Sequence, residues 1–128
     1  MIMLHRYLAA SAREPFAYGQ HDCATFAARW VEIRTGRDIS DGLIGRYTTM
    51  RDGLRIMRGL GLVDHVAFFA RALPRRDGLP RVGDLVAVAG LDGPAMGIWG
   101  GEAAHHLGET GLVALPLSQV TDVFEVSA

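Results

Sequence analysis

A turn-rich segment, Pro74–Arg81, divides the chain into two regimes of hydrophobic periodicity. Before it, apolar residues recur every three or four positions, which predicts amphipathic helices over about residues 1–73. After it, residues 82–127 form short apolar runs separated by glycine-containing turns, which predicts strands joined by hairpins. Helices followed by strands predict an α+β domain, in which N-terminal helices pack on a C-terminal antiparallel sheet of about five strands.

Local start and stop signals place the individual elements. Asp22, Thr48 or Thr49, and Asp64 are good N-cap residues, and Gly36 and Pro74 are good stop residues. Helices are therefore expected over residues 3–12, 23–35, 50–58 and 65–73. Strands are expected over residues 84–89, 95–99, 103–107, 112–117 and 121–126. Because 128 residues suit one domain with a sizeable core, residues 1–128 are interpreted as a single domain.

The only cysteine, Cys23, stands in the first turn of the helix that Asp22 caps. Unpaired backbone N–H groups and the positive end of the helix dipole favour a thiolate there, which predicts a nucleophile. The alternative is that Cys23 is a small buried apolar residue. A single cysteine excludes an internal disulfide and any CxxC-type zinc or redox site.

Three segments occur in the order of a known family. They are the helix start Gly19–Cys23, the run Val82–Val86 and the run Met96–Gly101. In this order they resemble the NlpC-type papain-like cell-wall peptidases, especially short relatives encoded among tail genes of phages and gene-transfer agents. The resemblance covers about residues 15–107. It implies a cysteine that attacks an amide of the peptidoglycan stem peptide, a second-strand histidine as general base, and a third-strand polar residue that orients this histidine.

Carried over to this sequence, Cys23 is the nucleophile, and the backbone around Asp22 and Cys23 donates to the oxyanion. Tyr18 and His21, in the loop before the cysteine, are further candidates for contacts to the substrate, although a loop histidine more often caps a helix or meets solvent. The position of the second-strand histidine is Ala95, so the candidate base is His105 or His106 on the third strand. Since neighbouring strand residues point to opposite faces, at most one of them faces Cys23.

Three functions remain open from the sequence. The first is a hydrolase of peptidoglycan stem peptides at the tip of a phage or gene-transfer-agent tail. The second is a catalytically inactive adaptor that keeps the scaffold and binds other tail-tip proteins. The third is an unrelated acyltransferase or transglutaminase-like cysteine enzyme, which would need the same Cys–His pair.

The composition limits the classes of molecule that the protein is expected to bind. With 13 basic and 14 acidic residues the formal charge is −1, which provides no basic field for nucleic acid. No cofactor is expected, and no metal, because the spacing of the histidines resembles no ligand motif. No apolar run is long enough for a membrane span, and the first residues lack the pattern of a secretory signal. We therefore expect synthesis in the host cytoplasm and, from the resemblance, a place at the virion tail tip.

Overall fold

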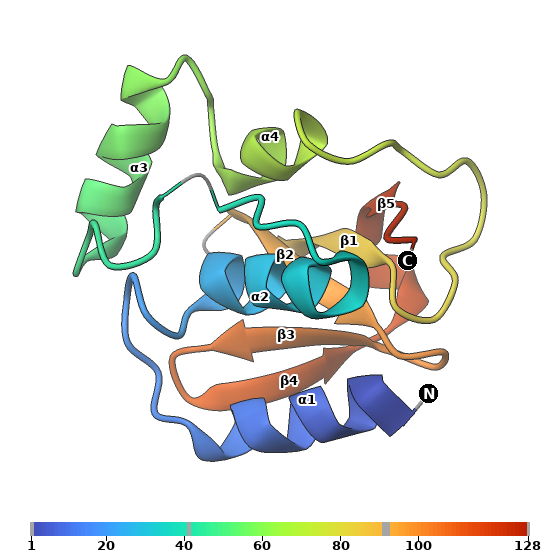
Figure 1. Cartoon of the computed structure of the whole chain (residues 1–128). Coiled ribbons are helices and arrows are strands. Elements are labelled where there is room, and N and C mark those ends of the chain that lie inside the picture. The colour runs from blue at the N-terminus through green and yellow to red at the C-terminus, as the bar shows by residue number, and fades with distance from the viewer. Residues whose placement is uncertain (1, 41, 91–92, 128) are drawn as a thin grey trace.

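The computed structural model has four helices followed by a five-stranded antiparallel sheet, which confirms the predicted α+β class (Figure 1). It describes residues 2–40, 42–90 and 93–127, so Met1 and Ala128, the ends of the predicted domain 1–128, lie outside the described residues. The helices are α1 (Ile2–Arg13), α2 (Cys23–Thr35), α3 (Met50–Gly59) and α4 (His65–Ala70). The strands are β1 (Leu85–Gly90), β2 (Gly93–Trp99), β3 (Ala104–Gly108), β4 (Gly111–Leu115) and β5 (Val120–Phe124).

Side-chain caps set the helix starts, as the sequence predicts. Asp22, Thr49 and Asp64 each accept a hydrogen bond from the backbone N–H three residues later. Gly36 ends α2 in the left-handed conformation, with φ of 79°. The fourth helix is shorter than expected and ends at Ala70, because residues 71–73 form turns before Pro74.

The five strands lie in the order β4-β3-β2-β1-β5, and each adjacent pair is antiparallel. The predicted fourth strand over 112–117 is wrong at its end, since β4 stops at Leu115. Pro116 has no N–H to donate to a ladder, and a short 3₁₀ helix, η1 (Leu117–Gln119), follows it. Consequently β5 starts and ends earlier than predicted.

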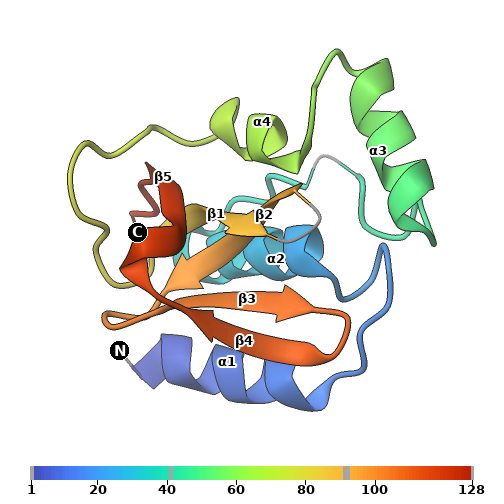
Figure 2. The ribbon, with the colours of Figure 1, turned by 180° about the vertical axis from the view of Figure 1, so that it is seen from behind.

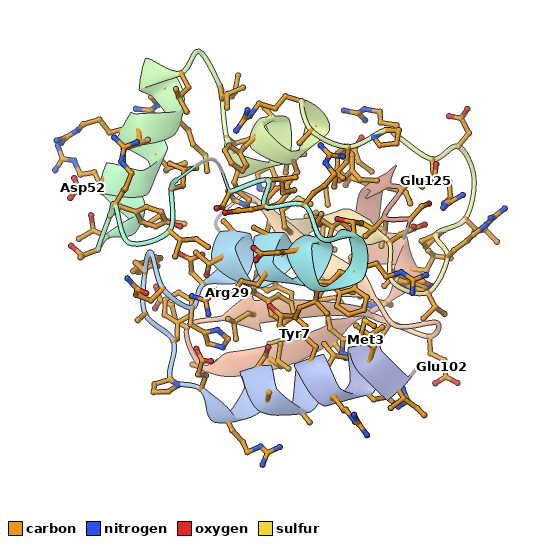
Figure 3. The ribbon with its side chains drawn as sticks, viewed as in Figure 1. Met3, Tyr7, Arg29, Asp52, Glu102 and Glu125 are labelled. Atoms are coloured by element: carbon orange, nitrogen blue, oxygen red, sulfur yellow. The ribbon has the colours of Figure 1, made fainter. Side chains whose placement is uncertain are left out.

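The core lies mainly between α2 and the sheet. α2 packs across β2 and β3, where Phe26, Trp30 and Val31 are fully buried. Tyr7 lies between α1 and α2, donates a 2.6 Å hydrogen bond to the Phe26 carbonyl and stacks on the Phe26 ring (Figure 3). A second, smaller apolar cluster lies on the other side of the sheet and includes Val86, Val88 and Trp99. Figure 2 views the ribbon from this side, with β2 in front of α2. Apolar side chains thus bury the sheet on both faces, and the N-terminus of α2 is held above β2.

A buried carboxylate ties the connector between helices and sheet to the start of β1. Asp84 is 1% exposed and accepts hydrogen bonds from the Arg76 guanidinium (2.7 Å) and from the backbone N–H groups of Arg81 (2.8 Å) and Val126 (3.3 Å). Three separate segments therefore converge on one side chain. Arg76 in turn has its pKa raised, chiefly by its hydrogen bond to Asp84.

This junction gives a stability prediction. We expect Asp84→Asn to lower the free energy of unfolding by about 2 kcal/mol or more, because an amide keeps only one acceptor oxygen and so leaves one of the two backbone N–H groups without an acceptor. The matched control is Asp122→Asn, which removes a more exposed carboxylate that pairs with Arg75 and is expected to cost less than about 1 kcal/mol. Urea unfolding of the three proteins measures both values, and equal losses would contradict the role of Asp84.

Candidate active site

Cys23 is the first residue of α2 and lies half-buried where the helix N-terminus meets β2. Three backbone groups favour its thiolate form through hydrogen bonds, namely those of Met96 on β2, of Ala24 and of Cys23 itself. The sulfur is therefore at the junction of the helix and the sheet, as the sequence predicts for a nucleophile at the start of this helix.

Asp22 fixes the start of α2 through both oxygens of its carboxylate and through its backbone N–H. Its Oδ1 accepts from the Thr25 N–H (2.9 Å), and its Oδ2 accepts from the Gly19 N–H (2.8 Å) and the Tyr47 hydroxyl (2.7 Å). Its own backbone N–H donates to the Thr25 hydroxyl (2.8 Å), which completes a capping box. The Asp22 N–H is thus engaged elsewhere, which leaves the backbone groups of Met96, Ala24 and Cys23 as those that hydrogen-bond the sulfur.

The loop before Cys23 interlocks with the segment before α3. Gly19 has φ of 82°, and a Cβ at this position would lie 1.9 Å from the Tyr47 carbonyl oxygen. The Gly19 carbonyl in turn accepts from the Gly45 N–H at 2.7 Å. Only glycine fits here, because both the left-handed backbone and the close approach exclude a side chain. Sequence analysis missed Tyr47, whose contact with Asp22 spans 25 residues.

The imidazole nearest to the thiol belongs to His65, which sequence analysis left without a role. His65 Nε2 lies 3.9 Å from Cys23 Sγ, and both side chains are partly buried. The residue is the first of α4, directly after its cap Asp64. The sequence did predict this cap. Nothing in the sequence indicates that the first side chain of this helix, 42 residues after Cys23, lies against the thiol.

The two candidate histidines of β3 differ in their surroundings. His106 Nδ1 donates to the Met96 carbonyl at 3.1 Å, so this nitrogen carries a proton. The charge of His106 also contributes to lowering the pKa of His65. His105 lies beside Gly100, where an added Cβ would meet its Nε2 at 2.6 Å, and its pKa is lowered by burial and by His5. Thus His106, rather than His105, is the β3 histidine whose charge reaches His65.

The two loop candidates also differ. His21 is buried with its Nε2 2.9 Å from the Ser11 carbonyl and its Nδ1 3.3 Å from the Glu14 carboxylate, so both ring nitrogens face α1 and the turn that follows it. Tyr18 donates a 2.6 Å hydrogen bond to Glu109 in the β3–β4 turn. This bond raises the Tyr18 pKa to about 12, with smaller contributions from burial and from the charges of Glu109, Cys23 and Asp22. Tyr18 is thus near the thiol, and His21 is part of the scaffold.

The surroundings of Cys23 oppose the activation by the helix dipole that the sequence predicts. Burial raises the pKa of the thiol to about 11, and the charge of Asp22 raises it further against the opposing backbone hydrogen bonds. Burial also lowers the pKa of His65. At neutral pH the pair is therefore an uncharged thiol beside an uncharged imidazole. Such a pair can react if the imidazole removes the proton as the sulfur attacks.

Two further findings bound the chemistry of the described part of the chain. Within it, no three histidine, cysteine, aspartate or glutamate side chains are grouped so that they could hold a metal ion. None of its helices is long and apolar enough to cross a membrane.

The raised thiol pKa predicts slow alkylation near neutrality. We expect the rate of reaction of Cys23 with iodoacetamide to rise with pH and level off near the folded pKa of about 11, whereas the denatured chain levels off near 9.0. Between these two values the unfolded state is ionised and the folded state is not, so stability falls as pH rises through this window. A plateau below 9.0 in the folded protein would show instead that the thiolate is stabilised.

The geometry of the loop at Gly19 predicts how much stability is lost when a methyl group is added there. We expect Gly19→Ala to destabilise the protein by about 1–2 kcal/mol for the left-handed backbone and by about a further 1–3 kcal/mol for the clash with Tyr47. Gly36→Ala is the matched control, because it has φ of 79° and open space around an added Cβ. Thermal or urea unfolding measures both. If the two variants lose equal stability, the close approach of the two loops does not constrain Gly19.

Comparison with protein families gives one result. The profile of a family described as Domain of unknown function (DUF6950) matches residues 2–126. Comparisons with curated proteins and with solved structures find no match. The matched range includes the described helices and strands together with Cys23, His65 and His106. The chain therefore belongs to the DUF6950 family.

Proposed function

We propose that this protein is an NlpC-type, papain-like cysteine hydrolase that cleaves an amide bond of the peptidoglycan stem peptide. The observation that carries the proposal is the 3.9 Å approach of His65 Nε2 to Cys23 Sγ at the N-terminus of α2. The sequence resemblance supports the substrate class and a place at the tail tip of a phage or gene-transfer-agent particle, after synthesis in the host cytoplasm.

In the proposed reaction the sulfur of Cys23 attacks the amide carbonyl carbon while His65 Nε2 takes the thiol proton. The backbone N–H groups of Cys23 and Ala24, at the start of α2, would donate to the negative oxygen that forms. Protonated His65 then gives its proton to the leaving amine, which leaves a thioester on Cys23. Water hydrolyses the thioester with His65 again as the base, and the free thiol returns.

His65 replaces a base that the family resemblance places on the second strand, where this chain has Ala95. The replacement comes from a different element, the first turn of α4, and reaches the thiol from the helical half of the chain. His106 supports it from β3: its Nδ1 donates to the carbonyl of Met96, whose backbone also hydrogen-bonds the thiol. We assign His106 as a positioning residue for the strand that faces Cys23.

A second candidate function is supported by the electrostatics. The raised pKa of Cys23 and the lowered pKa of His65 leave the pair uncharged, and Ala95 removes the usual base. These features suit a tail-tip adaptor that keeps the scaffold without turnover and binds neighbouring tail proteins. The retained approach of thiol and imidazole favours the hydrolase.

Digestion of purified peptidoglycan tests the proposal. We expect the wild-type protein to release stem-peptide fragments, detected by mass spectrometry, and Cys23→Ala to release none. His65→Gln should lower the rate about 10²–10⁴-fold, the usual contribution of a general base. His105→Gln is the matched control, since it removes the β3 imidazole that lies beside Gly100, and it should retain activity.

Other results would assign the function differently. A rate that falls with His105→Gln but not with His65→Gln would move the base to β3. If the folded wild-type protein releases no fragments, and particles assemble normally with Cys23→Ala, the adaptor is supported and the hydrolase is rejected.

A further inference from the structure

The Asp22 carboxylate takes one of its three hydrogen bonds from outside the start of α2 and the loop before it, from the hydroxyl of Tyr47. Tyr47 lies in the segment between α2 and α3 and is 8% exposed. An added Cβ at Gly19 would lie 1.9 Å from its carbonyl oxygen, and one at Gly53 of α3 would lie 3.1 Å from its ring. These close approaches restrict where the hydroxyl can lie, and it lies 2.7 Å from Asp22 Oδ2.

The Tyr47 hydroxyl stays a donor across the range in which the thiol titrates. Burial raises the pKa of Tyr47 far above its usual value, and the charge of Asp22 and the hydrogen bond to it raise the pKa further. The phenol therefore keeps its proton even near the pKa of Cys23, about 11. The charge of Cys23 also contributes to the raised pKa of Tyr47, so the hydroxyl lies within electrostatic reach of the sulfur.

The titratable side chains that act on the thiol or on His65 come from several elements, and β2 contributes the backbone of Met96. They are Asp22 before α2, Tyr18 in the preceding loop, Tyr47 before α3, Asp64 and His65 at the start of α4, and His106 on β3. Among these groups, Asp22 is the one whose charge opposes ionisation of Cys23. The reactivity of the thiol therefore depends on how strongly this negative charge acts on the sulfur.

A hydrogen bond donated to a carboxylate offsets part of its charge. The Tyr47 hydroxyl directs its positive hydrogen at Asp22 Oδ2 and so weakens the field that the carboxylate exerts on the sulfur. The other two donors are the backbone N–H groups of Gly19 and Thr25. Loss of the hydroxyl would leave these two alone, at a carboxylate that is 4% exposed, where charges are screened weakly.

We propose that Tyr47 is a positioning residue for the thiol: its hydroxyl holds the Asp22 carboxylate and offsets part of its charge, so that Cys23 ionises more readily during attack. The residue acts through Asp22. α3, which stands away from the sheet in Figure 1, takes part indirectly, because Gly53 packs against the ring that carries the hydroxyl. The importance of Tyr47 for catalysis rests on the proposed hydrolase, whereas its effect on the thiol does not.

The rate of alkylation by iodoacetamide tests the effect on the thiol. Tyr47→Phe keeps the ring against Gly53 and removes only the hydroxyl. We expect it to slow alkylation near neutrality about threefold and to move the plateau of the rate to higher pH, because less thiolate is present at each pH. Tyr7→Phe is the matched control: it also removes a partly buried hydroxyl, which donates at 2.6 Å to the Phe26 carbonyl, and it should leave the rate unchanged.

An Asp22→Asn background tests whether the effect passes through the carboxylate. Asparagine still caps a helix but carries no charge, so the thiol should react faster, and Tyr47→Phe should then change the rate little. A purely structural role of Tyr47 predicts the opposite direction in the parent, since a loosened loop exposes the thiol and speeds alkylation. The comparison of the two tyrosine variants stands even if the Asp22→Asn protein does not fold.

Three results would overturn the proposal: a rate that rises or is unchanged in Tyr47→Phe, an equal effect of Tyr7→Phe, or the same slowing in the Asp22→Asn background. Turnover separates this role from the proposed function. In a hydrolase we expect Tyr47→Phe to lower kcat on soluble stem-peptide fragments about threefold and to leave KM unchanged, and a change in KM alone would assign Tyr47 to substrate binding instead. If alkylation responds as expected while the wild-type protein cleaves no stem peptide, the positioning role stands and the hydrolase is rejected.

Discussion

The carboxylate of Asp22 accepts three hydrogen bonds, and the position of the thiol depends on them. One comes from the helix that it caps, one from the loop before it, and one from Tyr47 in a distant segment. Together they join the start of α2 to the chain that leads into α3. Any account of reactivity at Cys23 starts from this buried acceptor, because it fixes where the helix begins and therefore where the sulfur lies.

The same carboxylate also opposes ionisation of the thiol. A helix N-terminus by itself favours a thiolate, but here burial and the charge of Asp22 outweigh it. The group that positions the sulfur thus keeps it protonated. In a site of this kind the role of the imidazole is to remove a proton during attack, and its distance from the sulfur matters more than a resting ion pair.

Much of the fold was predictable because its signals are local. Asp22, Asp64 and Gly36 mark helix ends by chemistry that acts within a few residues, and the strands follow from apolar runs between glycines. The contact of His65 with Cys23 was not predictable, since it depends on how α4 packs. Nor was the role of Tyr47. The direction of the thiol pKa shift depends on burial, which a sequence pattern does not measure, and the family resemblance pointed to β2 and β3 for the base.

The sheet order has a consequence for synthesis of the chain. β1 lies between β2 and β5, so one side of its backbone is paired only when the residues around Phe124 arrive. Until then an apolar strand presents unpaired N–H and C=O groups, which are the groups that pair with other chains. The nascent protein therefore carries an open strand edge from the time β1 is made until β5 arrives and closes that edge.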